Sequence, residues 1–215
     1  MKKGFSIMLG IFLPISIFFI CINFFAFNKK YYETKYLQYN IPSSTDLEIS
    51  ELMKLTNELF DYFRGHKDEE YLRIYFNERE LAHIKDVKLL FNKGFLIRDI
   101  SITIFLTSFT YLYLVDFNVF IKTLNYSICS SFLGIGILFL FLILDFDKYF
   151  TYFHLMLFNN DLWLLDPSTD IMIRIFPEEF FISIARNIGL LFITFMSIML
   201  IVINSLKVRM NNKIE

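Results

Sequence analysis

The sequence predicts an all-α membrane protein, with four transmembrane helices, a mostly helical extracellular cap and both termini in the cytoplasm. The first observation behind this prediction is composition: 55% of the 215 residues are hydrophobic, which exceeds the share usual in soluble domains. The second is that this excess lies in four long apolar runs. The third is the uneven distribution of charge around those runs. Together they predict a single membrane domain over residues 1–215.

Each apolar run comes near the twenty or so residues that cross a bilayer as a helix. The first run follows Lys2 and Lys3 as a signal peptide would, but it is longer and lacks a small-residue cleavage site, so we expect it to be retained. Arg186 is the one charge inside the fourth run. The predicted transmembrane helices cover residues 5–27, 98–116, 125–144 and 180–206.

The orientation follows from the short charged flanks. Lysine and arginine precede the first run and follow the fourth, whereas acidic residues dominate the stretch after the third. Basic flanks favour the cytoplasmic side, so both termini are expected there. The remaining segments then divide into an extracellular cap at 28–97, a cytoplasmic loop at 117–124, an extracellular aromatic segment at 145–179 and a cytoplasmic tail at 207–215.

Composition also argues against some functions. The net charge is −1 and no basic stripe is present, so nothing indicates nucleic-acid binding. The two cysteines, Cys21 and Cys129, are expected near opposite faces of the membrane, too far apart for a disulfide. We interpret both as small apolar residues of the helix bundle.

The cap is expected to fold as two helices. Thr45 to Glu48 has a capping-box pattern before a helical run of leucines that ends at Gly65. Asn77 to Glu80 repeats the pattern, and Gly94 is a natural stop for the second helix. Between them the alternating residues 71–76 predict a short strand.

Two of the three histidines lie in polar and aromatic clusters. His83 stands one helical turn from both Glu80 and Asp86, so a carboxylate can reach its ring. The alternative interpretation is an ordinary solvated helix face. His66 falls in a charged run and is interpreted as part of a solvated loop.

His154 lies on a helical extension beyond the third run, which is expected to end near residues 159–160. Two X-Pro steps, at Pro167 and Pro177, then interrupt the chain before the fourth run. The aromatic residues there, Trp163 among them, are consistent either with a pocket or with ordinary interfacial anchors. Arg186 either reaches for the headgroups or binds an anionic or carbonyl group, because ionisable residues within a membrane are functional candidates.

Several well-marked kinds of catalytic site are missing from the sequence. It contains no HExxH helix, CxxC pair, Gly-x-Ser-x-Gly elbow or P-loop, and no three metal ligands at recognisable spacing. The chemistry that remains is general acid–base catalysis by histidine.

At these same residues the chain resembles the lipoprotein intramolecular transacylase family of bacterial integral membrane proteins. The resemblance spans nearly the whole length and rests on two motifs. The first is Asn77-Glu-Arg-Glu-Leu-Ala-His83-Ile-Lys-Asp86-Val, where family members typically have methionine in place of Ile84. The second is His154 followed by Phe158, Asn-Asp, Trp163-Leu-Leu-Asp166-Pro167, Asp170 and Phe176-Pro177-Glu178.

The resemblance implies an acyltransferase. Its expected reaction moves the sn-2 acyl chain of a diacylglyceryl lipoprotein to the α-amino group of the same N-terminal cysteine, giving the lyso form. It further implies a bacterial plasma-membrane location with the site at the outer face, membrane lipid as surroundings, and no cofactor or metal. The implied residues are His83 and His154 as catalysts, Asp86, Glu80 and Asp166 as orienting groups, and Phe158, Trp163, Asp170 and Arg186 in the substrate pocket.

Two other classes of function remain open from the residues alone. One is a metal-assisted membrane hydrolase that uses His83, His154 and Asp166, which inactivation by a chelator would favour. The other is a non-enzymatic membrane protein whose cap binds a partner, which survival of function without the two histidines would favour.

Overall fold

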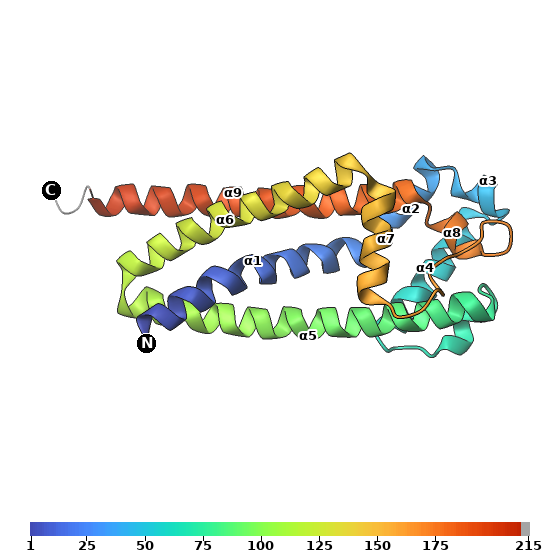
Figure 1. Ribbon diagram of the computed structural model, residues 1–215, viewed down its shortest axis with the longest axis horizontal. Helices are drawn as coiled ribbons and strands as arrows, with labels where there is room; N and C mark the ends of the chain where they lie inside the picture. The colour runs from blue at the N-terminus through green and yellow to red at the C-terminus, as the bar shows by residue number, and fades with distance from the viewer. Residues whose placement is uncertain (212–215) are drawn as a thin grey trace. The chain divides into compact units, whose positions relative to one another are not determined.

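The computed structural model describes residues 1–211, and it gives only the backbone for Leu142 and for residues 208–211. Residues 212–215, the end of the expected cytoplasmic tail, lie outside the described residues. Within the described part every regular element is a helix, so the all-α prediction is confirmed (Figure 1). The elements are α1 (Lys2–Ala26), α2 (Lys29–Gln38), α3 (Ile41–Thr45), α4 (Ile49–Phe63), the 3-10 helix η1 (Glu69–Leu72), α5 (Glu78–Val115), α6 (Phe117–Leu144), α7 (Phe146–Leu157), α8 (Ile171–Ile175) and α9 (Glu178–Asn211).

Four helices, α1, α5, α6 and α9, are long and apolar enough to cross a membrane, as the four runs predict. With 38 residues, α5 is far longer than a bilayer requires. At 1.5 Å per residue it extends about 57 Å, nearly twice the roughly 30 Å of hydrocarbon. The apolar half after Gly94 is therefore long enough by itself to span the membrane.

The predicted helix stop at Gly94 is wrong, because α5 passes through this residue without a break. A glycine inside a helix costs only about 1 kcal/mol relative to alanine. The long apolar run that follows outweighs this cost, because backbone groups in hydrocarbon must find their hydrogen bonds within the helix.

The chain forms two compact units, which are described separately. One, here called the membrane unit, comprises Met1–Asn23, Phe95–Ile143 and the described residues from Arg186 onward. The other, here called the histidine unit, comprises Phe24–Gly94 and Leu144–Ala185 and contains all three histidines.

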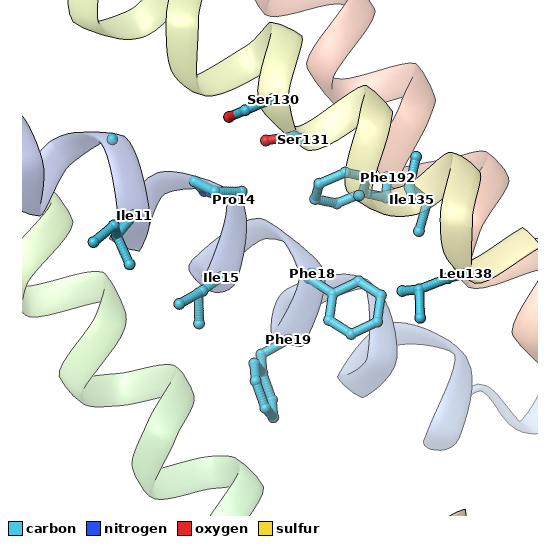
Figure 2. Close-up of a pocket in the computed structure, with 12 residues that line it drawn as sticks. Ile11, Pro14, Ile15, Phe18, Phe19, Ser130, Ser131, Ile135, Leu138 and Phe192 are labelled. Carbon is cyan, nitrogen blue, oxygen red and sulfur yellow. The ribbon is translucent and has the colours of Figure 1, made fainter.

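In the membrane unit, α1 packs against α6 near Pro14, which lies inside α1. Proline has no N–H, so the Gly10 carbonyl loses its helical donor; the Ser127 hydroxyl donates to it instead, at 2.7 Å. Past this contact an apolar groove of about 410 Å³ lies between α1 and α6, with Phe192 of α9 also lining it (Figure 2). Ser131 on its wall donates to the Ser127 carbonyl, so that hydroxyl is already satisfied.

The histidine unit has its own core. Tyr36, Leu52, Leu55, Leu72 and Ile175 are its most deeply buried members. They come from α2, α4, η1 and α8, so segments far apart in sequence share one apolar centre. This core supports the segments that carry the histidines.

Two details of the predicted cap are wrong. Residues 71–76 form the end of η1 and turns rather than a strand: Ile74 is 74% exposed while Phe76 is buried, although both would share one face of a strand. The first capping box pairs Glu48 with Glu51, not Thr45 with Glu48, because Thr45 ends α3. The end of the helix near Gly65 is confirmed, with this glycine at a φ of +76°.

Candidate active site

The position of His83 depends on how α5 begins. The Glu80 N–H donates to the Asn77 side-chain oxygen at 3.0 Å, and the Asn77 N–H donates to a Glu80 carboxylate oxygen at 2.8 Å. This is the predicted capping box, and it satisfies donors that a helix start leaves unpaired. His83 lies one turn further along the helix and is only 7% exposed. The solvated-face interpretation of His83 is therefore wrong.

Glu80 also connects α5 to a distant segment. Its side chain is 1% exposed, and its second carboxylate oxygen accepts the Met172 N–H of α8 at 2.7 Å. Burial raises the pKa of Glu80, and the N–H groups of Met172 and Asn77 oppose that rise. The carboxylate thus joins the start of the His83 helix to the segment that follows His154.

Arg79 and Asn77, also at the start of α5, make further contacts with residues 158–170. The Arg79 guanidinium donates to the carbonyls of Asp161 and Leu164, at 3.1 and 2.6 Å. The Asn77 amide donates to the buried carboxylate of Asp170 at 2.8 Å. Arg79 therefore fixes the backbone on both sides of Trp163.

Asp170 organises the turn around Pro167. Its other oxygen accepts the Asp166 N–H at 2.7 Å. Burial would raise the pKa of Asp170, but the donors from Asp166 and Asn77 outweigh it and hold this pKa below its usual value. Asp166 itself is exposed, and one of its oxygens accepts both the N–H and the hydroxyl of Ser168. Its carboxylate is therefore engaged in the turn.

His154 lies in the last turn of α7, whose first turn is capped by Asp145 through the Lys148 N–H. Its ring is also 7% exposed. Nδ1 is 2.7 Å from the Phe150 carbonyl oxygen, which can only accept. Nδ1 therefore carries the proton of the neutral ring, and Nε2 is the nitrogen with a free lone pair.

Three aromatic side chains, Phe150, Phe158 and Trp163, pack against the two histidines. The ring centroids of His83 and His154 are 6.3 Å apart. Phe158 contacts both, at 5.4 Å from His83 and 5.7 Å from His154. Trp163 stacks on His154 at 4.8 Å and Phe150 meets it edge-on at 4.3 Å. Residues 71 positions apart in sequence thus form one dry cluster.

Burial keeps both imidazoles neutral. It lowers the pKa of His83 to about 4, with a further decrease from His154 and a partial opposing rise from Asp86. It also lowers the pKa of His154, against a rise from the Phe150 carbonyl. At pH 7 both rings are therefore unprotonated and able to accept a proton.

The structure gathers most, but not all, of the predicted site residues. Glu80, Phe158, Trp163 and Asp170 lie in the contacts above. The Asp86 carboxylate accepts from the Asn160 amide at 2.8 Å, so its influence on His83 is electrostatic. His66 is exposed, as expected for a solvated loop, and Arg186 is exposed and belongs to the membrane unit.

Arg79, Phe150 and Asn160 were not predicted as site residues, although residues 159–160 were expected to end a helix. The capping-box spacing marks the start of the helix but says nothing about what Arg79 binds. In the described residues no group of three histidine, cysteine or acidic side chains is arranged to hold a metal ion. The set proposed for a metal-assisted hydrolase therefore does not come together as a ligand cluster.

The family model for the lipoprotein intramolecular transacylase Lit matches residues 7–181, most of the chain. The chain belongs to this family. No curated protein sequence matches it.

Solved structures of the transacylase Lit from Bacillus cereus agree with this family membership. One is 26% identical, with a TM-score of 0.85 over 99% of this chain and 97% of that one. Two structures of the same protein with one histidine replaced, by alanine and by arginine, give TM-scores of 0.84 and 0.83 at 24% and 25% identity. They cover 98% of this chain and 96% and 95% of theirs. The chain is therefore a membrane-integral acyltransferase of the transacylase family.

Proposed function

We propose that this transacylase moves the sn-2 acyl chain of a diacylglyceryl lipoprotein to the α-amino group of the same N-terminal cysteine. His83 and His154 act as its general acid–base pair. The observation that carries the proposal is the pair of buried, neutral imidazoles 6.3 Å apart in an aromatic cluster.

Aminolysis of an ester requires proton transfer at two points. The neutral amine attacks the ester carbonyl carbon, a C–N bond forms, and a proton leaves the nitrogen. The C–O bond to glycerol then breaks, and the glyceryl oxygen takes up a proton. The histidine pair removes one proton and returns one, so the enzyme ends as it began.

The tautomer of His154 favours this ring as the first acceptor. With Nδ1–H directed at the Phe150 carbonyl, Nε2 presents its lone pair. This arrangement resembles that of other catalytic histidines, whose second nitrogen is fixed by a hydrogen bond. Burial lowers the pKa of His83 to about 4, so this ring gives up a proton readily and suits the return of a proton to the leaving oxygen.

Holding the substrate amine next to the ester supplies much of the rate enhancement that acid–base catalysis does not. Amine and ester belong to one molecule, so holding that molecule folded can supply several kcal/mol of the barrier. The hydrogen bonds of Arg79, Glu80 and Asn77 suit this role, since they join the start of the His83 helix to the segment that follows His154. The ring cluster also excludes water, which would otherwise hydrolyse the ester.

The test of the proposed reaction uses purified protein in detergent with a mixture of two diacylglyceryl lipoproteins. One carries light acyl chains and a light peptide, and the other carries heavy versions of both. Transfer within one molecule keeps both chains on their own peptide, so mass spectrometry should find only all-light and all-heavy lyso products. Crossed products would contradict intramolecular transfer.

The same assay separates the alternatives. Acetylation of the substrate α-amine should abolish turnover, because that amine is the acceptor. A hydrolase would still release the fatty acid. Addition of a chelator should leave the rate unchanged, and loss of activity with chelator would favour the metal-assisted hydrolase instead.

We further propose that the histidine unit faces the outside of a bacterial plasma membrane and that both termini are cytoplasmic. The basic flanks of α1 and α9 motivate this orientation. The test places a cysteine at one of three exposed positions, in a background without Cys21 and Cys129. In intact cells, His66→Cys and Asn159→Cys should react with an impermeant maleimide. Lys122→Cys should react only after lysis, and the reverse pattern would contradict the orientation.

A further inference from the structure

Trp163 carries a buried polar atom that the proposed acid–base mechanism does not use. Its indole nitrogen is shielded from solvent and has no hydrogen-bond partner among the described residues. A buried tryptophan N–H normally finds an acceptor, and an unpaired buried donor in a native structure calls for an explanation. Here the chain provides the donor and leaves the acceptor to another molecule.

The indole is held beside the reacting histidine. Its ring stacks on His154 with centroids 4.8 Å apart and planes 23° from parallel. Arg79 binds the carbonyls of Asp161 and Leu164 on either side of Trp163, and the Leu165 N–H bonds to the Trp163 carbonyl at 3.0 Å. The donor is thus fixed by backbone contacts before any substrate arrives, which is what stabilisation of a developing charge requires.

The chemistry of the proposed reaction identifies the missing acceptor. The group that must come next to His154 is the ester carbonyl, because the amine attacking it gives its proton to this ring. As the C–N bond forms, the carbonyl oxygen gains negative charge and needs a donor. The His154 N–H already donates to the Phe150 carbonyl, and His83 takes part in the proposed proton transfer, so neither supplies a dedicated donor.

We propose that the Trp163 indole N–H donates a hydrogen bond to the ester carbonyl oxygen of the lipoprotein and stabilises its oxyanion. The inference rests on the proposed function. In the tetrahedral intermediate the electron pair of the carbonyl π bond lies on this oxygen. When that pair forms the π bond again, the C–O bond to glycerol breaks, the glyceryl oxygen takes up a proton from the histidine pair, and the hydrogen bond from Trp163 weakens.

Trp163→Phe tests the donor, because phenylalanine keeps a ring to stack on His154 and removes only the N–H. The expected result is a kcat about 100- to 1,000-fold lower with KM near that of the unmodified protein, the scale for losing one oxyanion donor. The thermal unfolding midpoint should be no lower, since an unpaired buried donor disappears. Unchanged kcat, or a raised KM alone, would overturn the proposal.

A second measurement applies even if that variant is unstable. Trp163 is the only tryptophan in the chain, so the ultraviolet resonance Raman band sensitive to indole N–H hydrogen bonding reports on this residue alone. Adding a diacylglyceryl lipopeptide with an acetylated α-amine, which binds but cannot react, should shift the band to its hydrogen-bonded position. An unshifted band at saturating lipopeptide would overturn the proposal.

The outcomes also separate this inference from the proposed function. If the unmodified protein makes no N-acylated product, the proposed function fails, whatever Trp163→Phe does. If the unmodified protein makes that product and Trp163→Phe makes it equally fast, only the oxyanion role fails.

Discussion

Replacing His83 or His154 by alanine should lower the rate of acyl transfer by about 100-fold or more, the usual scale for removing a general acid or base. Both rings are buried, neutral and within one aromatic cluster, so neither has an obvious substitute. The double variant should be little worse than either single one, because the two rings act as a unit. The measurement is the initial rate of lyso-lipoprotein formation by the purified protein.

The third histidine provides the control. His66 is exposed, and its Nδ1 lies 3.9 Å from an Asp61 carboxylate oxygen. His66→Ala should therefore retain nearly the full rate. Equal losses at all three positions, or retained activity without His83 and His154, would rule out a two-histidine mechanism. His83→Gln, of similar size, separates loss of the acid–base group from loss of packing.

The sequence was sufficient to predict the elements whose cause is local. Long apolar runs gave the four candidate spans, and the Asn77–Glu80 spacing gave the true start of α5. The breaks at Pro167 and Pro177 also follow from residues beside them, because proline cannot continue a helix. They delimit α8, which ends at Ile175.

What could not be predicted depends on contacts between distant segments. The burial of His83 depends on His154 of α7 and on the ring of Phe158, which no helical periodicity around residue 83 encodes. Arg79 binds backbone carbonyls, which every residue has, so no pattern in residues 161–164 marks them as its partners. The strand predicted at 71–76 failed because tertiary burial of Leu72 and Phe76 decided that segment.

Glu80→Ala should have the largest effect on stability of any change in the capping motif. Both carboxylate oxygens accept partly buried backbone N–H groups, from Asn77 and Met172, and alanine leaves both donors unpaired. A fully buried donor left unpaired costs about 1–3 kcal/mol, and because these two are only partly buried, a total of about 2–4 kcal/mol is expected. For a chain of this length that corresponds to a midpoint lower by on the order of 10 °C, measured by thermal unfolding in detergent.

Two matched variants show whether the loss of stability comes from the two backbone hydrogen bonds of Glu80 or from the loss of a negative charge. Glu78→Ala removes a neighbouring exposed carboxylate paired with Arg73, so its midpoint should change little. Glu80→Gln keeps the size of the side chain but turns one acceptor into a donor that faces an N–H, so it should remain clearly destabilised. A Gln variant as stable as the unmodified protein would mean that only one of the two bonds matters. The bond from Glu80 to Met172 also helps to hold the segment that carries Trp163. Both Glu80 variants should therefore lose acyl-transfer activity as well as stability. Glu78→Ala should retain its stability and its acyl-transfer activity.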